Sequence, residues 1–246
     1  MEKKTETAVD PPCSMIVVAA GQGKRFGSTL PKQYRPVSGV PLLVHTLTHL
    51  QAHPLINRIV PIIAADGFSL WDAFMSPHLG RLPKVTAPVT GGAERQHSVQ
   101  RGIEALNLAA EAWIGIHDGA RPLVSRTLLD RLFQARDSAD ALIAALPAQD
   151  TIKQVGTDHR ITGTLQREEI WLAQTPQIFR YGLIRSALEA AAADGFIGTD
   201  DASLVERLGL PVLVVPGDAH NIKVTHPRDE ALASLLLAEE DACQGA

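Results

Sequence analysis

The sequence predicts an α/β fold in which a mostly parallel sheet lies between two layers of helices, giving three layers in all. Short continuous apolar runs such as Met15–Ala20 and Ala141–Leu146 are typical of strands that are buried on both faces of a parallel sheet. Between such runs, apolar residues recur at helical spacing, as in the stretch 40–50. Strands that alternate with helices of this length favour a parallel sheet covered by helices on both sides.

The first part of the chain follows this alternation from element to element. One helix is predicted to begin near Val40 and to stop at His53-Pro54, and a later one to begin at an N-cap formed by Ser125. The strand predicted over 59–65 contains Pro61, which indicates an irregular position within it. The other elements expected before residue 141 are a weaker strand over 84–89, a helix after the TGGAER stretch and a strand over 113–116.

The alternation breaks at about residues 150–175. There, β-branched and polar residues alternate around a GTDHR turn, a pattern that predicts a projecting β-hairpin. A helix over 181–193, a strand over 211–215 and a closing helix over 227–239 complete the expected elements. We therefore expect residues 1–13 to form a disordered tail and residues 14–240 to form a single domain, with an arm at about 150–173.

The composition of the 246-residue chain excludes several classes of protein. Its 23 Lys and Arg against 27 Asp and Glu give a net charge of −4, and binding to a nucleic-acid backbone depends on excess positive charge. Nucleic acid is therefore not expected as a partner. No run of eighteen apolar residues occurs, so a membrane is not expected as a partner either. The N-terminus lacks an apolar signal segment and the two cysteines lack metal-binding spacing, which predicts a cytoplasmic protein.

A Gly-rich stretch after the first predicted strand is the strongest local signal of function. The sequence AAGQGKRFG over 19–27 has the spacing G-x-G-x-x-x-G, which differs by one residue from the dinucleotide fingerprint, and it lacks the ending of a Walker A loop. Small residues let backbone N–H groups approach a phosphate or a base closely. Four cations lie within twelve residues here, which favours a triphosphate as ligand: Lys24, Arg25, Lys32 and Arg35.

Three further motifs end strands that should meet at the same edge of the sheet. The stretch from Gly91 to Ser98 opens a helix whose free N–H groups suit a nucleotide. The motif HDGARP places Asp118 at a strand tip, as a Mg²⁺ site with few protein ligands requires, and NIKVT adds Lys223. Ligands in open α/β sheets bind at the carboxyl ends of the strands, so these motifs predict one binding site.

The chain resembles the 2-C-methyl-D-erythritol 4-phosphate cytidylyltransferase family. The resemblance rests on seven motifs, which occur in this order: AAGQGKRFG, PKQY, GGAERQHSV, HDGARP, QTPQIF, TDDASLVE and NIKVT. The resemblance covers about residues 14–236. It implies a nucleotide-diphospho-sugar transferase (Rossmann-like) fold with a projecting β-arm, and a homodimer clasped by exchanged arms. It also implies CTP and a polyol phosphate as substrates and Mg²⁺, or another divalent cation, as cofactor.

The resemblance implies roles for individual residues. Contacts to the nucleotide are implied for Ala19, Ala20, Gly21, Gly23, Gly92, Ser98 and Asp118. Catalytic roles are implied for Arg25, Lys32, Arg167 and Lys223. Thr151, Arg167 and Thr199 would line the pocket of the polyol phosphate, with Arg167 reaching across from the partner subunit, and Asp118 would lie near the metal. Ala93 and Gly119 depart from the residues common in the family.

The implied chemistry agrees with these residue types. The substrate phosphate attacks the α-phosphorus of CTP in line and expels pyrophosphate. A phosphomonoester has a second pKa of about 6, so it is largely dianionic at pH 7 and needs no general base. Fixed cations and a metal ion are suited to bringing two polyanions together and to stabilising the transition state.

Several other polar and aromatic residues are expected to have structural roles. His117 should be structural, and one of Asp200 and Asp201 should cap a helix. The tryptophans Trp113 and Trp171 should fill core or dimer contacts. Three histidines at a spacing of four residues are expected on a solvated helix face: His45, His49 and His53.

Three alternative functions remain open from the sequence. A ribitol-5-phosphate cytidylyltransferase would share the fold, the chemistry and most of the motifs. An NAD-dependent oxidoreductase is disfavoured, because G-x-G-x-x-G is missing. A non-catalytic nucleotide-binding protein is expected to have lost one of the four charged residues Arg25, Lys32, Asp118 and Lys223, all of which are present. The loop over 21–34 is expected to be mobile before a nucleotide binds.

Overall fold

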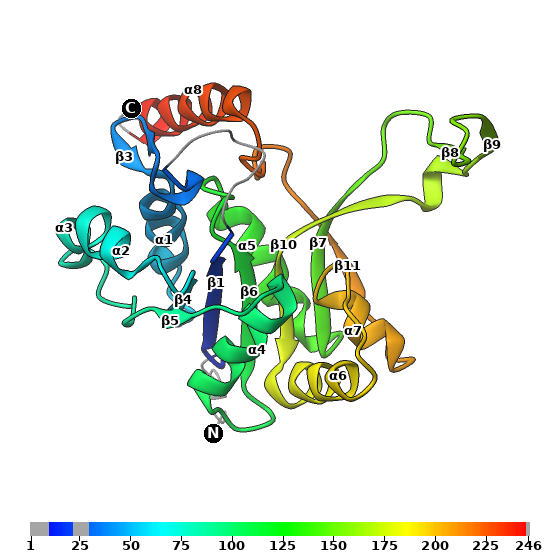
Figure 1. Ribbon diagram of the computed structural model, residues 1–246, viewed down its shortest axis with the longest axis horizontal. Helices are drawn as coiled ribbons and strands as arrows, with labels where there is room; N and C mark the ends of the chain where they lie inside the picture. The colour runs from blue at the N-terminus through cyan, green and yellow to red at the C-terminus, as the bar shows by residue number, and fades with distance from the viewer. Residues whose placement is uncertain (1–9, 22–29, 245–246) are drawn as a thin grey trace, which may run out of the picture.

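A seven-stranded sheet runs through the centre of the molecule in the computed structural model, which describes residues 10–21 and 30–244 (Figure 1). The strand order is β11-β7-β10-β6-β1-β4-β5. In chain order these strands are β1 (Cys13–Ala19), β4 (Ile56–Ile63), β5 (Val89–Thr90), β6 (Trp113–Asp118), β7 (Ala141–Pro147), β10 (Trp171–Arg180) and β11 (Leu213–Pro216). Cys13 is buried in β1, so its assignment to a terminal tail is wrong; residues 1–9 lie outside the described part.

The sheet is mostly parallel, which confirms the predicted class. Strand β1 pairs in parallel with β4 and β6, and β7 pairs in parallel with β11. Strand β10 lies antiparallel between β6 and β7, and it was not predicted. Its apolar pattern is interrupted by Gln174 and Thr175, and its pairing register with β7 shifts between Ala173 and Gln177, so it lacks the continuous apolar run of its neighbours.

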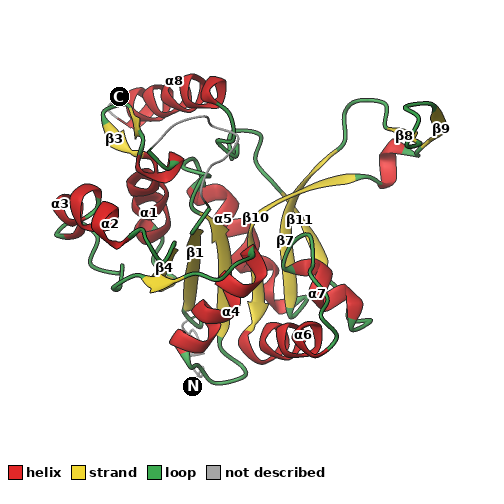
Figure 2. Cartoon of the chain, viewed as in Figure 1, coloured by secondary structure: helices red, strands yellow, loops and turns green. Residues whose placement is uncertain are grey.

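Helices cover both faces of the sheet (Figure 2). Successive side chains of a strand point to opposite faces, so Met15 and Val17 of β1 pack with α1 and α5, whereas Ile16 packs with α4 and α6. The helices are α1 (Leu42–Ala52), α2 (Phe68–Phe74), α3 (Ser76–Leu79), α4 (Arg95–Leu106), α5 (Arg126–Gln134), α6 (Tyr181–Ala193), α7 (Ala202–Arg207) and α8 (Pro227–Gln244). Ser125 caps α5 as predicted, because its hydroxyl accepts a hydrogen bond from the Leu128 N–H.

Two expectations concern the edge of the sheet, and one of them is wrong. The strand expected over 84–89 is reduced to an isolated bridge between Val85 and Ile59 and to the two residues of β5. Pro61 keeps regular register opposite Val17 of β1. On its other side the ladder is interrupted between the bridge and β5, so the position that lacks an N–H lies at an irregular point of the sheet, as expected.

The three histidines of α1 do not form a solvated face. His45 Nε2 lies 2.8 Å from the Val37 carbonyl, and His49 contacts the Pro122 carbonyl and Glu240 of α8. His53 is only 2% exposed, and its Nε2 lies 2.9 Å from an Asp130 oxygen. The expectation failed because three different segments cover these side chains: the chain at Val37 covers His45, α8 and the loop after β6 cover His49, and α5 covers His53.

A hairpin projects from the sheet, as predicted for the segment around GTDHR (Figure 1). Its strands are β8 (Lys153–Val155) and β9 (Ile161–Thr164), and another small hairpin consists of β2 (Pro36–Val37) and β3 (Val40–Pro41).

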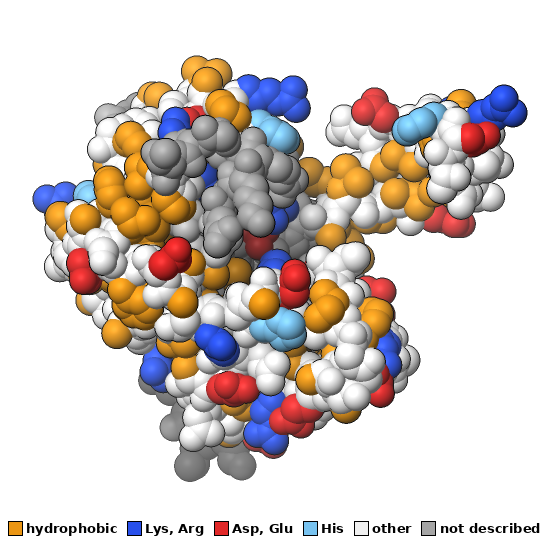
Figure 3. Space-filling model, in the orientation of Figure 1, with side chains coloured by type: hydrophobic (Ala, Val, Ile, Leu, Met, Phe, Trp, Pro, Cys, Tyr) orange, Lys and Arg blue, Asp and Glu red, His pale blue; other side chains and the backbone are white. Residues whose placement is uncertain are grey.

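Figure 3 shows hydrophobic side chains along the projecting arm. The large apolar residues exposed there are Val155, Ile161, Leu165, Trp171 and Leu172. Trp113, by contrast, is buried. In the described part of the chain, no helix has the length and apolar character needed to cross a membrane.

The close packing of α4 on β1 can be tested at Gly102. A Cβ at this position would lie 2.8 Å from Cδ1 of Ile16, so Gly102→Ala should lower the free energy of unfolding by about 1–3 kcal/mol despite the better helix propensity of alanine. Urea denaturation measures the change. The exposed Glu104→Ala on the same helix serves as control and should change stability by about 0.5 kcal/mol or less. A Gly102→Ala protein at least as stable as the wild type would contradict the packing argument.

Candidate active site

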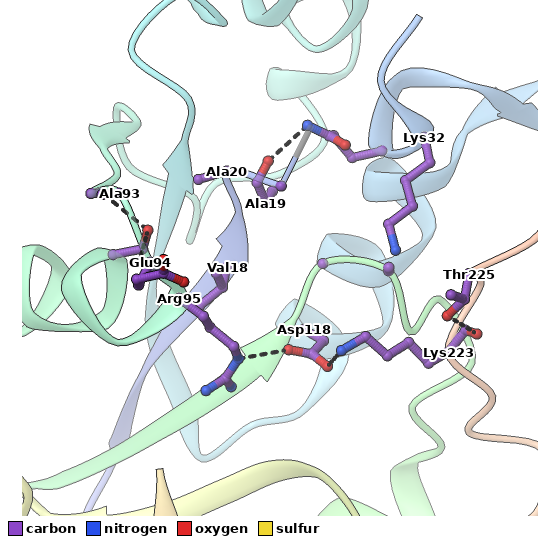
Figure 4. A pocket seen from close by; sticks show the side chains of 16 residues that line it. Val18, Ala19, Ala20, Lys32, Ala93, Glu94, Arg95, Asp118, Lys223 and Thr225 are labelled. Atoms are coloured by element: carbon purple, nitrogen blue, oxygen red, sulfur yellow. Dashed lines mark hydrogen bonds and ion pairs between the residues drawn. The ribbon is translucent and has the colours of Figure 1, made fainter. Parts of the chain in front are cut away.

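A pocket of about 540 Å³ opens at the carboxyl ends of β1 and β6. Its wall also includes the turn η2 (Lys32–Tyr34), the N-terminus of α4 and the segment before α8 (Figure 4). The segments that form it are far apart in the sequence and meet because parallel strands end at one edge of the sheet. The pocket brings together eight of the residues predicted for the site: Ala19, Ala20, Gly21, Lys32, Gly92, Ser98, Asp118 and Lys223.

Glycines are required where the loop before α4 passes the end of β1. A Cβ on Gly91 would lie 2.6 Å from the Cβ of Ala20, and one on Gly92 would collide with His97. The Ser98 hydroxyl accepts a hydrogen bond from the Gly92 N–H at 3.1 Å and donates one to the Glu94 carbonyl at 3.2 Å. Ser98 therefore holds this loop against the first turn of α4, with a backbone groove beside it.

Asp118 is the electrostatic centre of the pocket. Its Oδ1 lies 3.3 Å from Nε of Arg95, and its Oδ2 lies 2.7 Å from Nζ of Lys223 and 3.7 Å from Nε of Arg121. Burial alone would raise the pKa of Asp118, but the charges of Arg95 and Lys223 outweigh it and hold that pKa far below its ordinary value. In Figure 4 the carboxylate lies between Arg95 on one side and Lys223 on the other. The carboxylate is therefore ionised in the folded protein.

The turn after the Gly-rich stretch fixes a further cation at the pocket. The Lys32 ammonium donates a hydrogen bond to the Val224 carbonyl at 2.8 Å, and Gln33 donates one to the Ala19 carbonyl at the end of β1. Arg35 does not join the pocket, although it belongs to the same cluster of cations in the sequence. Its guanidinium forms an ion pair with Glu230 of α8 at 2.5 Å.

Other predicted site residues are not in this pocket. Thr151 and Arg167 lie exposed on the arm, where Arg167 donates a hydrogen bond to the Gln149 carbonyl. Thr199 is exposed in the loop between α6 and α7. Gly23 and Arg25 lie outside the described residues, as does the part of the 21–34 loop for which mobility was expected.

Arg95 is the main pocket residue that the sequence analysis did not assign. Its Nη2 lies 2.8 Å from the buried carboxylate of Asp201, so the guanidinium bridges Asp118 and Asp201. Burial lowers the pKa of Arg95, but the two carboxylates outweigh it and raise that pKa above its ordinary value. The GGAER motif contained this residue, but its sequence position alone did not distinguish a bridging arginine from a solvated one.

His117 is structural, as expected. It is fully buried, its Nε2 lies 3.1 Å from the Arg121 carbonyl, and its Nδ1 lies 3.1 Å from the Thr175 hydroxyl. The same hydroxyl accepts a hydrogen bond from the Asp118 N–H. A neutral imidazole fits these partners, because Nε2–H can donate to the carbonyl while Nδ1 accepts from Thr175. His117 thus supports the backbone that carries Asp118.

The buried imidazole makes stability depend on pH. Burial lowers the pKa of His117 from 6.5 to about 4, so the unfolded chain takes up a proton more readily than the folded one. The contribution of His117 is complete above pH 6.5 and is lost as the pH falls toward 4, a change on the order of 3 kcal/mol. His117→Gln should therefore flatten the fall in unfolding free energy over this range, measured by urea denaturation. A slope for His117→Gln equal to that of the wild type would contradict the assignment.

Comparison with known proteins shows which family this chain resembles. The family model described as 2-C-methyl-D-erythritol 4-phosphate cytidylyltransferase matches residues 13–239. A protein of that name from Syntrophus aciditrophicus is 46% identical over 227 residues, which cover 92% of this chain and 96% of that protein. A protein of the same name from Symbiobacterium thermophilum is 44% identical over 229 residues, or 93% of this chain and 94% of that one.

Solved structures lead to the same family. The crystal structure of the Francisella tularensis 2-C-methyl-D-erythritol 4-phosphate cytidylyltransferase has a TM-score of 0.78 at 30% identity, covering 91% of this chain and 99% of that one. The Thermus thermophilus structure of the same name has a TM-score of 0.72 at 33% identity, covering 92% and 98%. The expected nucleotide-diphospho-sugar transferase fold agrees with these neighbours. Because the family model matches residues 13–239 and the relatives are up to 46% identical over nearly the whole chain, the chain belongs to the 2-C-methyl-D-erythritol 4-phosphate cytidylyltransferase family.

Proposed function

We propose that this pocket transfers the cytidylyl group of CTP to 2-C-methyl-D-erythritol 4-phosphate, giving 4-diphosphocytidyl-2-C-methyl-D-erythritol and pyrophosphate. Membership of the family supplies the reaction. The observation that carries the assignment to this pocket is the meeting of Lys32, Asp118 and Lys223, from three distant segments, in a space of about 540 Å³. Two substrates with about six negative charges between them need fixed cations such as Lys32 and Lys223, and an ionised carboxylate such as Asp118 can hold a metal ion beside them.

The nucleotide is proposed to lie against the small residues at the end of β1 and the groove before α4. Ala19, Ala20 and Gly21 leave the backbone accessible, and Gly92 and Ser98 form the opposite wall. Gly23 belongs to the same proposed contact surface. At position 93 the alanine side chain has no polar group to offer, so any recognition of the nucleotide there uses the backbone.

The transfer itself requires positioning and charge stabilisation and no general base. The phosphate of the acceptor, already largely dianionic at pH 7, attacks the α-phosphorus in line while pyrophosphate leaves. Lys32 and Lys223 are proposed to stabilise the charge that develops on the oxygens of the transferred phosphoryl group, together with Arg25. His117 takes no part in this, because its ring nitrogens are both engaged below the pocket floor.

A divalent cation such as Mg²⁺ fits the donor set of the pocket. Asp118 supplies an ionised carboxylate, and Mg²⁺ in nucleotide sites is commonly held by one or two carboxylates plus substrate phosphates. No cluster of three or more acidic, histidine or cysteine side chains suited to a metal occurs in the described part of the chain. When bound, the metal would neutralise phosphate charge and polarise the reacting phosphoryl group.

The acceptor pocket is proposed to form between two subunits. Thr151 and Arg167 lie on the arm and Thr199 lies in the loop after α6, so an exchanged arm would bring the first two to the partner's pocket. The exposed apolar residues of the arm support burial in a homodimer. We therefore propose a catalytic domain that includes Cys13 of β1 and extends to about residue 240, with a dimerisation arm at about 150–173. A cytoplasmic location is also proposed, because the thiol of Cys13 is free.

Pyrophosphate release from CTP tests the function directly. Methylerythritol phosphate and ribitol 5-phosphate are offered in parallel with Mg²⁺, and the proposal predicts release with the first and little with the second. Preference for ribitol 5-phosphate would establish the alternative acceptor on the same chemistry. Binding of CTP without release from either acceptor would favour a nucleotide-binding protein.

The proposed role of Lys32 predicts a large loss of activity on truncation. Lys32→Ala should lower kcat/KM by about 10²–10³, as the loss of one transition-state donor typically does. Lys84→Ala is a matched control, because Lys84 also donates to a backbone carbonyl, that of His53, but lies away from the pocket. The control should retain turnover per folded molecule. Near-wild-type turnover in Lys32→Ala would remove this residue from the reaction.

Mixing of two inactive variants tests the exchanged arm. Lys32→Ala and Arg167→Ala are each expected to be strongly impaired alone. If Arg167 acts in the partner's pocket, a co-expressed dimer of the two variants has one site with both residues intact. Random pairing makes half of the dimers mixed, so about a quarter of wild-type activity should return. If Arg167 served its own subunit, every site in the mixture would lack one residue and no activity would be regained.

A further inference from the structure

Arg95 joins a carboxylate in the pocket to a carboxylate buried outside it. The first is Asp118, at 3.3 Å from Nε, and the second is Asp201, at 2.8 Å from Nη2. Asp201 is 1% exposed and does not line the pocket. A buried carboxylate is costly unless it is paired, so Arg95 is what makes the burial of Asp201 tolerable.

Among the contacts of the described residues, no side-chain hydrogen bond other than the pair with Arg95 explains why Asp201 is buried here. It stands at the N-cap of α7 but accepts no capping hydrogen bond. The capping expected of one of the two aspartates is performed by Asp200, whose Oδ1 accepts from the Ser203 N–H and whose Oδ2 accepts from Gln177. Within the described chain, the one basic residue that forms an ion pair with Asp201 is Arg95. The two neighbouring aspartates therefore have separate functions.

The first turn of α4 is bound to the same loop at a second point. Gln96 donates a hydrogen bond to the Phe196 carbonyl and accepts one from the Gly198 N–H. Arg95 and Gln96 together attach α4 to the loop that contains Thr199, which we assign to the acceptor pocket. The nucleotide side of the site and the loop on the acceptor side are thus linked through two adjacent residues of one helix.

The link limits how the guanidinium can meet Asp118. While Asp201 holds Nη2, Arg95 presents Nε to Asp118 and leaves Oδ2 to Lys223 and, more distantly, Arg121. Without the Asp201 charge, the guanidinium is free to turn toward both oxygens of Asp118 or toward a bound phosphate. Either change would shift the Asp118 carboxylate and its balance with Lys223.

We propose that Asp201 is a positioning residue for the transfer reaction, acting through Arg95 to fix the Asp118 carboxylate and to join it to the loop that carries Thr199. The inference rests on the proposed function. It extends that function to a residue that does not line the pocket.

A double-mutant cycle tests whether Asp201 acts through Asp118. Asp201→Asn should lower kcat/KM with CTP and methylerythritol phosphate by about tenfold or more, the usual effect of losing a partner that orients a site residue. Asp118→Asn should lower it further. The double variant should be no worse than Asp118→Asn alone, because the two changes remove one linked function. Multiplication of the two single effects would overturn the proposal.

Asp200→Asn is the matched control on the same loop. It removes the charge of the capping aspartate and leaves the Arg95–Asp201 pair in place. Its kcat/KM should stay within about threefold of the wild type, and any effect should multiply with that of Asp118→Asn. A loss equal to that of Asp201→Asn would indicate general weakening of the loop and would overturn the proposal.

A second variant and a second measurement distinguish the loss of positioning from misfolding of the Asp201→Asn protein. Arg95→Lys keeps the positive charge, but one ammonium cannot bridge both carboxylates, so it should lose activity as Asp201→Asn does. Amide hydrogen exchange over 196–201 should be faster in both variants and unchanged in Asp118→Asn. Unchanged exchange in both would overturn the link to the loop. An inactive wild type would instead overturn the proposed function, and this inference with it.

Discussion

The site depends on keeping one buried carboxylate ionised among several cations. Asp118 ends β6 in the middle of the sheet, where desolvation opposes its charge, and Arg95 and Lys223 more than compensate. The same contacts bring α4 and the segment before α8 to the carboxyl edge of the sheet. Ion pairs thus help to assemble the pocket, and the loss of Arg95 would leave the buried Asp201 carboxylate without its ion-pair partner.

Residues outside the pocket also hold Asp118 in place. The buried His117 and the Thr175 hydroxyl hold the backbone of Asp118, and Thr175 belongs to β10, the antiparallel strand. The outer end of β10 continues into the projecting arm. One strand thus contributes both to the support of Asp118 in the pocket and to the arm proposed to complete the partner's acceptor site.

Much of this arrangement could be predicted from residue patterns. The parallel class, the hairpin around GTDHR, the cap at Ser125 and the convergence of Lys32, Asp118 and Lys223 all follow from local signals and from the rule that strands of a parallel sheet end at one edge. The solvated face expected for the α1 histidines failed. It depended on which distant segments would cover them, and these are the segment around Val37, the loop after β6 together with α8, and α5.

By itself the sequence determined the parallel α/β class, the family and most of the charged residues at the sheet edge, because periodicity and motif spacing are local properties of the chain. Only the tertiary structure decided which of those charges meet. Arg35 turns to Glu230 of α8 while Lys32 lines the pocket, and Arg95 pairs both with Asp118 and with Asp201, which lies 106 positions further along the chain than Arg95. The physical reason is that an ion pair depends on distance and burial, and both are set by the packing of elements that are remote in the chain.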